Sequence, residues 1–188
     1  MMVKNEQLFT LAFSQGSAPE PIKWRRFKSW HHSDYRYLEK SYPDAVAFVP
    51  KRDVWFFGFG LASNYHSKDM KLQCKWLIGK DQEKQDDGWF DIEVNEADKD
   101  PETKWHTVDI RNLGEKPFKV SEGEWIHVVV RQTTDDYEYR RTFYGYSGYR
   151  NEQESIPDQE VDFYMEYSNL NDNGTSDSWG EFPFILYA

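Results

Sequence analysis

The sequence predicts an all-β fold, a two-layer antiparallel β-sandwich, and two observations lead to this prediction. Hydrophobic residues recur mostly with a period of two, which is typical of strands with one buried face, and no segment has the pattern of a long helix. Only 38% of the chain is hydrophobic, yet the 188 residues include 13 Phe, 12 Tyr and 8 Trp. Large rings remove a large area from water, so we expect one folded domain with an aromatic rather than an aliphatic core.

Seven short segments are predicted strands, because each is rich in β-branched or aromatic residues and is bounded by turn residues. In chain order they are residues 44–49, 54–61, 70–78, 105–110, 125–130, 161–167 and 182–187. The alternation is clearest in residues 70–78, where Met70, Leu72 and Cys74 are separated by polar residues. Pro183 indicates that the last segment is an edge strand or that a strand begins there.

The segment 54–61 (VWFFGFGL) is hydrophobic at every position, so we expect it at the centre of a sheet. Regular alternation would give one face Trp55, Phe57, Phe59 and Leu61, and the other face Val54, Phe56, Gly58 and Gly60. Two glycines on one face leave room for a large ring or another backbone to approach closely.

Two further segments frame the predicted domain, which spans residues 24–188. Residues 1–23 are expected to form an N-terminal tail or an extra strand. Residues 80–104 are the most polar and acidic part of the chain, and we expect them to form a long solvated hairpin or insertion.

The charge and cysteine content limit the partners and the compartment. The formal net charge is −10, which argues against nucleic acid or an anionic membrane surface as the main partner. A single Cys excludes an internal disulfide and any multi-cysteine metal site, and it favours a reducing compartment. We therefore expect a cytoplasmic protein, with association with the cytoskeleton as a further expectation.

No motif in the sequence supports catalysis or metal binding. Residues 145–149 (GYSGY) lack the final glycine of a nucleophile elbow, since Tyr149 stands there. A calcium loop starting at Asn169 would need Asp at its first position and Glu at its twelfth, which is Gly180. His31 and His32 would point to opposite faces of a strand. We therefore expect no enzyme, no cofactor and no metal site.

The segment 23–28 (KWRRFK) is basic and aromatic in an otherwise acidic chain. One interpretation is a strand that buries Trp24 or Phe27 and leaves its charges in water. The alternatives are a binding patch for an acidic protein segment or, less in keeping with the net charge, for nucleic acid.

Three blocks of sequence occur together in the order seen in one family. The first is Arg26-Phe27, Trp30 and residues 44–49 (DAVAFV), the second is 54–61 (VWFFGFGL), and the third joins 173–176 (NGTS), 180–183 (GEFP) and 185–187 (ILY). Together they resemble the PHR domain, a module named after the Pam/Highwire/RPM-1 ubiquitin ligases and also found at the C-terminus of some BTB adaptor proteins. The resemblance implies a β-sandwich of jelly-roll type.

The chain also departs from that family. Ala62-Ser63 stands where the family usually continues with Tyr-Gly, and the sequence holds no BTB domain or RING. The ligase activity of larger members is therefore not carried over.

The resemblance further implies that partners bind to loops at one end of the sandwich. By this analogy we expect residues 63–68, 144–149 and 171–179 to form those loops. The candidate partner-binding residues are Tyr146, Tyr149, Trp179, Asn171, Asn173, Asn64 and His66.

The predicted function is a non-catalytic protein-interaction module that docks a protein partner, on its own or within a multi-protein assembly. Two alternatives stay open at this point. One is a structural subunit of a larger assembly of cytoskeletal or ciliary type. The other is a sandwich that binds carbohydrate or a small ligand, which would need a row of coplanar Trp and Tyr rings on an open face.

Overall fold

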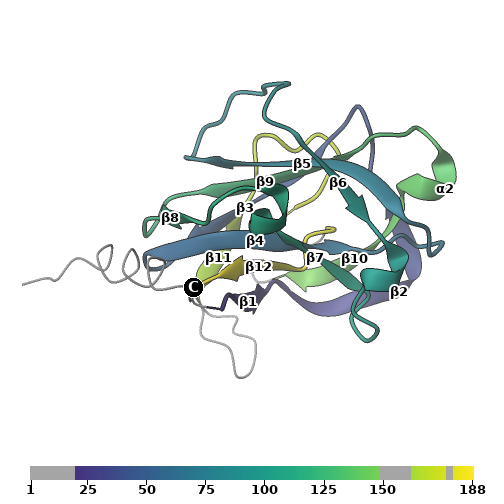
Figure 1. The fold of residues 1–188 in the computed structure, drawn as a ribbon, viewed down its shortest axis with the longest axis horizontal. Coiled ribbons are helices and arrows are strands. Elements are labelled where there is room, and N and C mark those ends of the chain that lie inside the picture. Colours follow the sequence, from purple (N-terminus) through teal and green to yellow (C-terminus); the bar gives the residue numbers. More distant parts are fainter. Residues whose placement is uncertain (1–19, 149–161, 177–179) are drawn as a thin grey trace, which may run out of the picture.

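The computed structural model describes residues 20–148, 162–176 and 180–188, with side chains throughout except at 28–34, 137 and 146–148. Two five-stranded sheets pack face to face, as predicted, and every strand pair is antiparallel (Figure 1). No helix in the described part of the chain is long and apolar enough to cross a membrane.

The first sheet, here called the β4 sheet, is centred on β4 (Val54–Ala62). Its order is β1 (Ile22–Arg25), β12 (Phe184–Tyr187), β4 and β7 (Trp105–Asp109). The short strand β8 (Phe118–Val120) pairs with the first residues of β4, whereas β7 pairs with the later ones. The N-terminal strand β1 therefore joins the sheet through the C-terminal strand β12.

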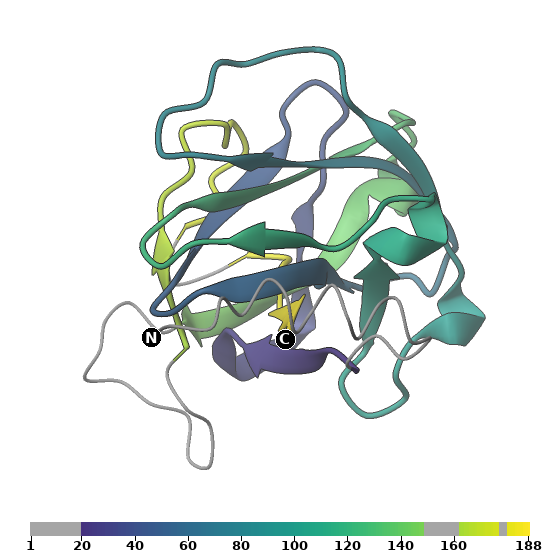
Figure 2. The same cartoon turned by 60° about the vertical axis from the view of Figure 1, so that its left-hand side comes forward.

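The second sheet, here called the β9 sheet, has the order β11 (Phe163–Glu166), β3 (Asp44–Pro50), β9 (Ile126–Gln132), β5 (Met70–Ile78) and β6 (Phe90–Val94). A two-stranded ribbon of β2 (Phe27–Tyr37) and β10 (Arg141–Gly148) lies beside the sandwich (Figure 2). In the part of the chain that the structure describes, three single-turn helices connect strands: η1 (Glu96–Asp98), η2 (Ile110–Leu113) and α2 (Tyr137–Arg140).

All seven predicted strands are confirmed within a few residues, and residue 161 alone lies outside the described part. Strand β5 has the bounds that its alternation predicts. The prediction that residues 144–149 form a loop is wrong for 144–148, because β10 continues through them. Gly145 does not make a turn here; it makes room for the Phe27 ring, whose nearest atom would lie 2.0 Å from an added Cβ.

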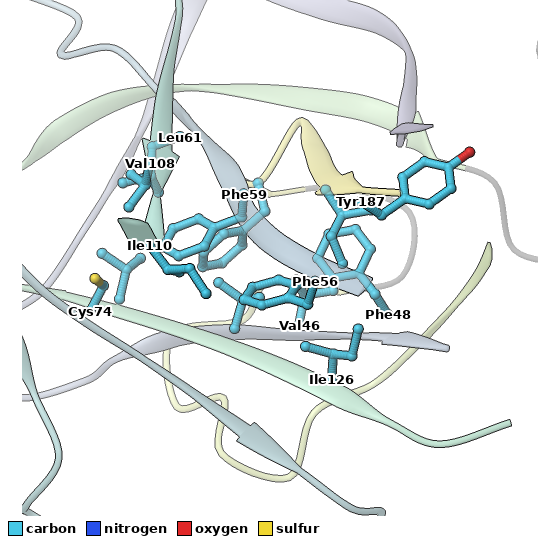
Figure 3. Close-up of a cluster of buried hydrophobic side chains, with 14 of the residues drawn as sticks. Val46, Phe48, Phe56, Phe59, Leu61, Cys74, Val108, Ile110, Ile126 and Tyr187 are labelled. Carbon is cyan, nitrogen blue, oxygen red and sulfur yellow. The ribbon is translucent and has the colours of Figure 1, made fainter. Parts of the chain in front are cut away.

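The main core lies between the two sheets (Figure 3). Of its twenty-four buried residues in the described chain, seven are aromatic, so the expectation of an aromatic rather than an aliphatic core is wrong by residue number. Eleven of the twenty-four are Val or Ile, and strand β9 alone supplies Ile126, Val128 and Val130. Phe48, Phe56 and Phe59 are among the largest fully buried side chains.

Strand β4 contains a β-bulge that changes which residues face the core. Leu186 pairs with Gly58 and Tyr187 pairs with Phe56, so Phe57 is an extra residue. As a result Phe56 and Phe59 both face the main core, whereas Phe57 packs with Trp105 and Phe184 in a second cluster. The face assignment from regular alternation is therefore wrong, because a bulge shifts the alternation by one residue.

The two glycines of β4 confirm the expected close approach. Gly58 has a φ of +146°, and an added Cβ would lie 2.0 Å from the Val108 carbonyl oxygen of the neighbouring strand. At Gly60 an added Cβ would lie 2.4 Å from the Phe184 ring. Only glycine fits at these two positions without movement of its neighbours.

The acidic segment 80–104 is mostly exposed to solvent, and two parts of it pack against the sandwich. Its first part folds over the outer face of the β9 sheet, where Trp89 packs against a cluster of Ala45, Val129 and Leu170. The guanidinium of Arg131 lies 4.1 Å from the Trp89 ring centre. Strand β6 then adds to the edge of the β9 sheet through β5.

Candidate interaction surface

The three segments predicted to bind a partner come together around β10. On one side, the Phe143 amide donates to Ser63 O at 3.0 Å and the Tyr65 amide donates to Arg141 O at 2.8 Å. Further along, the Gly145 amide donates to Gly180 O at 2.9 Å. The 63–68 loop, β10 and the start of the C-terminal segment are therefore neighbours in the fold.

Asn64 lies inside this region rather than on its surface. Its side chain is fully buried, and its amide nitrogen donates to Glu138 O and Tyr139 O at 3.0 and 3.1 Å. Its amide oxygen accepts from the His66 backbone N–H at 2.8 Å. Asn64 therefore fixes the shape of the 63–68 loop and holds that loop against α2.

Asn171 and Asn173 have the same kind of role in the 171–176 loop. The buried Asn171 side chain donates to Thr175 O at 2.6 Å and accepts from the Ala45 amide at 3.3 Å. The Asn173 side chain donates to Asp44 Oδ2 at 2.9 Å and also to Tyr37 O. Both amides serve contacts within the chain that attach this loop to β3 and β2.

A buried polar cluster that sequence reasoning missed lies beneath this loop. Thr175 Oγ1 is 2.5 Å from Asp44 Oδ1 and 2.8 Å from Glu181 Oε2, and all three residues are at most 1% exposed. Burial, followed by the nearby Glu181 carboxylate, raises the pKa of Asp44 well above its ordinary value. A hydroxyl carries one proton, so Thr175 can donate to one carboxylate only. A protonated Asp44 that donates to Thr175 would satisfy both contacts.

Two arginines donate to further carbonyls of the C-terminal segment. Arg26 is fully buried and donates to Phe182 O at 3.3 Å and to Ser176 O. Arg36 donates to Asn173 O at 2.6 Å, and its Nε lies 3.7 Å from Glu181 Oε1. In the segment 23–28, Trp24 and Phe27 are both buried, as one interpretation expected, but they lie on two strands, the end of β1 and the start of β2. Arg26, between the two strands, is buried with them.

A partly exposed group of rings and cations lies on the ribbon and the 63–68 loop. We call it the aromatic–arginine surface, and its members are Tyr35, Tyr37, Tyr65, His66, Arg141 and Phe143. Tyr65 is at its centre, with ring centroids 5.1 Å from Tyr35, 5.4 Å from His66 and 5.3 Å from Phe143.

Arg141 joins the rings of this surface to its histidine. Its guanidinium lies 4.2 Å from the Tyr35 ring centre, and its Nη1 lies 2.9 Å from His66 Nε2. His66 is exposed and the other five members are partly buried. The surface thus presents rigid rings and one positive charge beside water.

The three aromatic candidates named from sequence cannot be placed as anchors. The backbone of Tyr146 lies in β10 opposite Ser29, but its side chain is outside the described part. Tyr149 and Trp179 also lie outside the described residues. Of the seven candidates, His66 alone has a described side chain that is exposed.

The only Ser–His pair within hydrogen-bond distance in the described chain is not arranged for catalysis. His127 Nδ1 lies 2.8 Å from Ser168 Oγ, and His127 Nε2 lies 2.8 Å from Gly79 O. Because a carbonyl only accepts, Nε2 carries the ring proton and Ser168 donates to Nδ1. Both side chains are fully buried, so no substrate reaches the hydroxyl. Within residues 20–148, 162–176 and 180–188, no group of three or more His, Cys, Asp or Glu could hold a metal ion.

Comparison with known protein families agrees with the resemblance seen in the sequence. The sequence model of the PHR domain matches residues 25–188. The chain belongs to the PHR domain family. Comparison with curated protein sequences gives no match.

The blocks that mark the PHR domain have clear structural roles in this chain. The VWFFGFGL block is the bulged central strand β4. The NGTS block supplies Thr175 to the buried carboxyl cluster, and the GEFP block supplies Glu181. These blocks therefore shape the core and the buried carboxyl cluster beneath the 171–176 loop. The aromatic–arginine surface lies beside that loop.

Proposed function

We propose that this PHR domain is a non-catalytic protein-interaction module that binds a partner protein through the aromatic–arginine surface. Membership of the family supports a protein-interaction role in general. The composition of the surface supports the finer proposal, because Tyr and Arg are enriched among the residues that dominate binding energy at protein interfaces.

The observation that carries the proposal is the packing around Tyr65. Its ring contacts rings from both the ribbon and its own loop, so it is held in place before any partner arrives. A preordered ring loses little conformational entropy on binding, which is the property of an anchor residue. The neighbouring Asn64, buried and bonded to four backbone groups, keeps the loop in this shape.

Quantitative affinity capture tests the proposal with matched variants. Tyr65→Ala removes the central ring, and His66→Ala removes the exposed imidazole. Tyr42→Ala is the control, since Tyr42 is 59% exposed and makes none of the ring contacts of this surface. Thermal unfolding confirms that each variant is folded.

We expect Tyr65→Ala to weaken capture of a specific partner by roughly 30-fold, the loss that follows from removing one interface anchor of about 2 kcal/mol. His66→Ala should weaken it less, and Tyr42→Ala should leave it unchanged. Equal capture by all four proteins would contradict the proposed site. Loss of capture by Tyr42→Ala alone would place the site elsewhere.

The two alternative functions have less support. A structural subunit would be expected to show large apolar patches, and the large hydrophobic side chains exposed in the described chain are Ile22, Tyr42, Tyr139 and Tyr167. A carbohydrate site would need coplanar rings on an open face. The described residues contain one stacked ring pair, Trp76 and Phe90, and both rings pack partly against the core.

A further inference from the structure

A cleft of about 500 Å³ lies between β6 of the β9 sheet and β7 of the β4 sheet. Residues of both strands line it, and some of them are members of the main core. Its apolar lining includes Ile92, Val94 and Val108, which are 7–9% exposed and are among the least deeply buried members of the main core. The cleft is therefore an opening into the layer between the sheets.

Both strands that border the cleft are edge strands. In the described chain β6 pairs with β5 alone, and β7 pairs with β4 alone. An edge strand carries backbone N–H and C=O groups that no neighbouring strand uses. An extended peptide can pair with such an edge, which is a common mode of peptide recognition.

The rim of the cleft is acidic. Five carboxylates line it, from Asp91, Glu93, Asp98, Asp100 and Asp109, against one lysine, Lys99. Asp109 pairs with Arg111 and Glu93 pairs with Lys71, whereas Asp91, Asp98 and Asp100 have no ion pair among the described residues. Lys99 pairs with Glu96 outside the cleft lining.

The charge of Asp100 and the spacing of the acids bear on what this cleft can bind. Hydrogen bonds from Thr103 lower the pKa of Asp100, so this group is ionised at neutral pH. The acids of the rim do not gather around one point, since no three His, Cys, Asp or Glu side chains in the described chain are placed to hold a metal ion. A row of separated negative charges fits a chain that carries several positive charges.

His106 adds an observation that is independent of the acids. It is 4% exposed, lines the cleft from β7, and its ring makes no hydrogen bond within the described part of the chain. Burial and the nearby Lys99 lower its pKa to about 4, so the ring is neutral at neutral pH. A neutral imidazole has one donor and one acceptor, and buried polar groups are normally satisfied. An incoming backbone amide can supply both partners.

We propose that this cleft binds an extended segment of a partner protein that carries lysine or arginine at alternate positions. The segment adds as a strand at the open edge of β6 or β7, its apolar side chains cover Ile92, Val94 and Val108, and its cations lie over Asp91, Asp98 and Asp100. His106 hydrogen-bonds to the segment's backbone. This site differs in residues and in charge from the aromatic–arginine surface, and it does not depend on it.

Isothermal titration calorimetry with two short capped peptides tests the proposal. One alternates lysine and valine, and the other alternates glutamate and valine. The double variant Asp91→Asn, Asp98→Asn neutralises the rim, and Asp81→Asn, Asp135→Asn makes the same charge change away from the cleft. Amide hydrogen exchange on the full chain locates the bound peptide.

We expect the lysine peptide to bind and the glutamate peptide not to bind. The rim variant should bind roughly fivefold more weakly, as expected for two partly exposed ion pairs, while the control variant is unchanged. Amides of Phe90–Val94 or Trp105–Asp109 should gain protection when the lysine peptide is present. Tyr65→Ala should leave this binding intact, which separates it from the proposed function.

Three results would overturn the proposal. They are the absence of binding by the lysine peptide, an equal loss in the rim and control variants, and binding without new protection on either edge strand. The second result would mean that the peptide responds to net charge alone. The third would mean that it binds at another surface.

Discussion

Replacing Asp44 by Asn should change how the stability of this PHR domain depends on pH. Asp44 is fully buried, and burial followed by the Glu181 carboxylate raises its pKa well above the ordinary value. Its carboxyl group contacts Thr175 Oγ1 and the Asn173 amide nitrogen. An Asn at this position can accept from Asn173 and donate to Thr175, while Thr175 donates to Glu181. Asp44→Asn therefore reproduces the hydrogen bonds of a protonated Asp44.

The sign and size of the effect follow from linkage between protonation and folding. The folded pKa of Asp44 lies above its unfolded value of about 3.9, so the native state binds this proton more tightly. The stability that the protonated group contributes is fully present below the unfolded pKa and is lost as pH rises through the folded pKa. Between those two values the wild type should lose roughly 1 kcal/mol per pH unit relative to Asp44→Asn.

Urea unfolding of both proteins from pH 4 to pH 8 measures this difference. Near pH 4 the two stabilities should be similar, and at higher pH the variant should be the more stable of the two. Asp53→Asn is a control of opposite sign, because a hydrogen bond from Lys119 lowers the pKa of Asp53, so that its contribution is lost as pH falls. Parallel stability curves for wild type and Asp44→Asn across this range would refute the assignment of a raised pKa to Asp44.

Three further experiments, two on variants and one on the unchanged protein, should give distinct results. Gly60→Ala should destabilise the domain by about 1–3 kcal/mol in urea unfolding, because the new Cβ would lie 2.4 Å from the buried Phe184 ring. Thr175→Val should cost about 1–3 kcal/mol, since it leaves two buried carboxyl groups without their shared hydroxyl. Burial raises the pKa of Cys74 to about 12, so a thiol reagent at pH 8 should modify it only as fast as the protein unfolds. Rapid labelling of native protein, or wild-type stability in either variant, would contradict these expectations.

Much of the fold could be predicted because alternation of hydrophobic residues is a local signal. The seven predicted strands, β5 with its bounds among them, are present. The faces of β4 could not be predicted, because the bulge at Phe57 depends on how β12 pairs with it. Strand β10 was missed because a glycine that makes room for the Phe27 ring looks, in sequence, like a glycine in a turn.

It could be predicted that the three candidate segments lie close together, but not what their individual residues do. The 63–68 loop, the 144–148 segment and the C-terminal loop do meet around β10. Asn64 and Asn171 are buried and bond to backbone groups, a role that depends on partners distant in sequence. No local pattern links Asp44 to Thr175, since 131 residues separate them. The aromatic–arginine surface was missed for the same reason, because its rings come from three separate segments.

Site-specific photo-crosslinking tests the central claim most directly. The photoreactive residue p-benzoylphenylalanine would replace Tyr65 in one protein and the control Tyr42 in another, after thermal unfolding shows that both are folded. The account predicts that irradiation in native extract joins one specific protein to position 65, that Arg141→Ala weakens this product, and that position 42 gives none. A product of equal yield at both positions, or none at position 65 while the partner still binds, would contradict it.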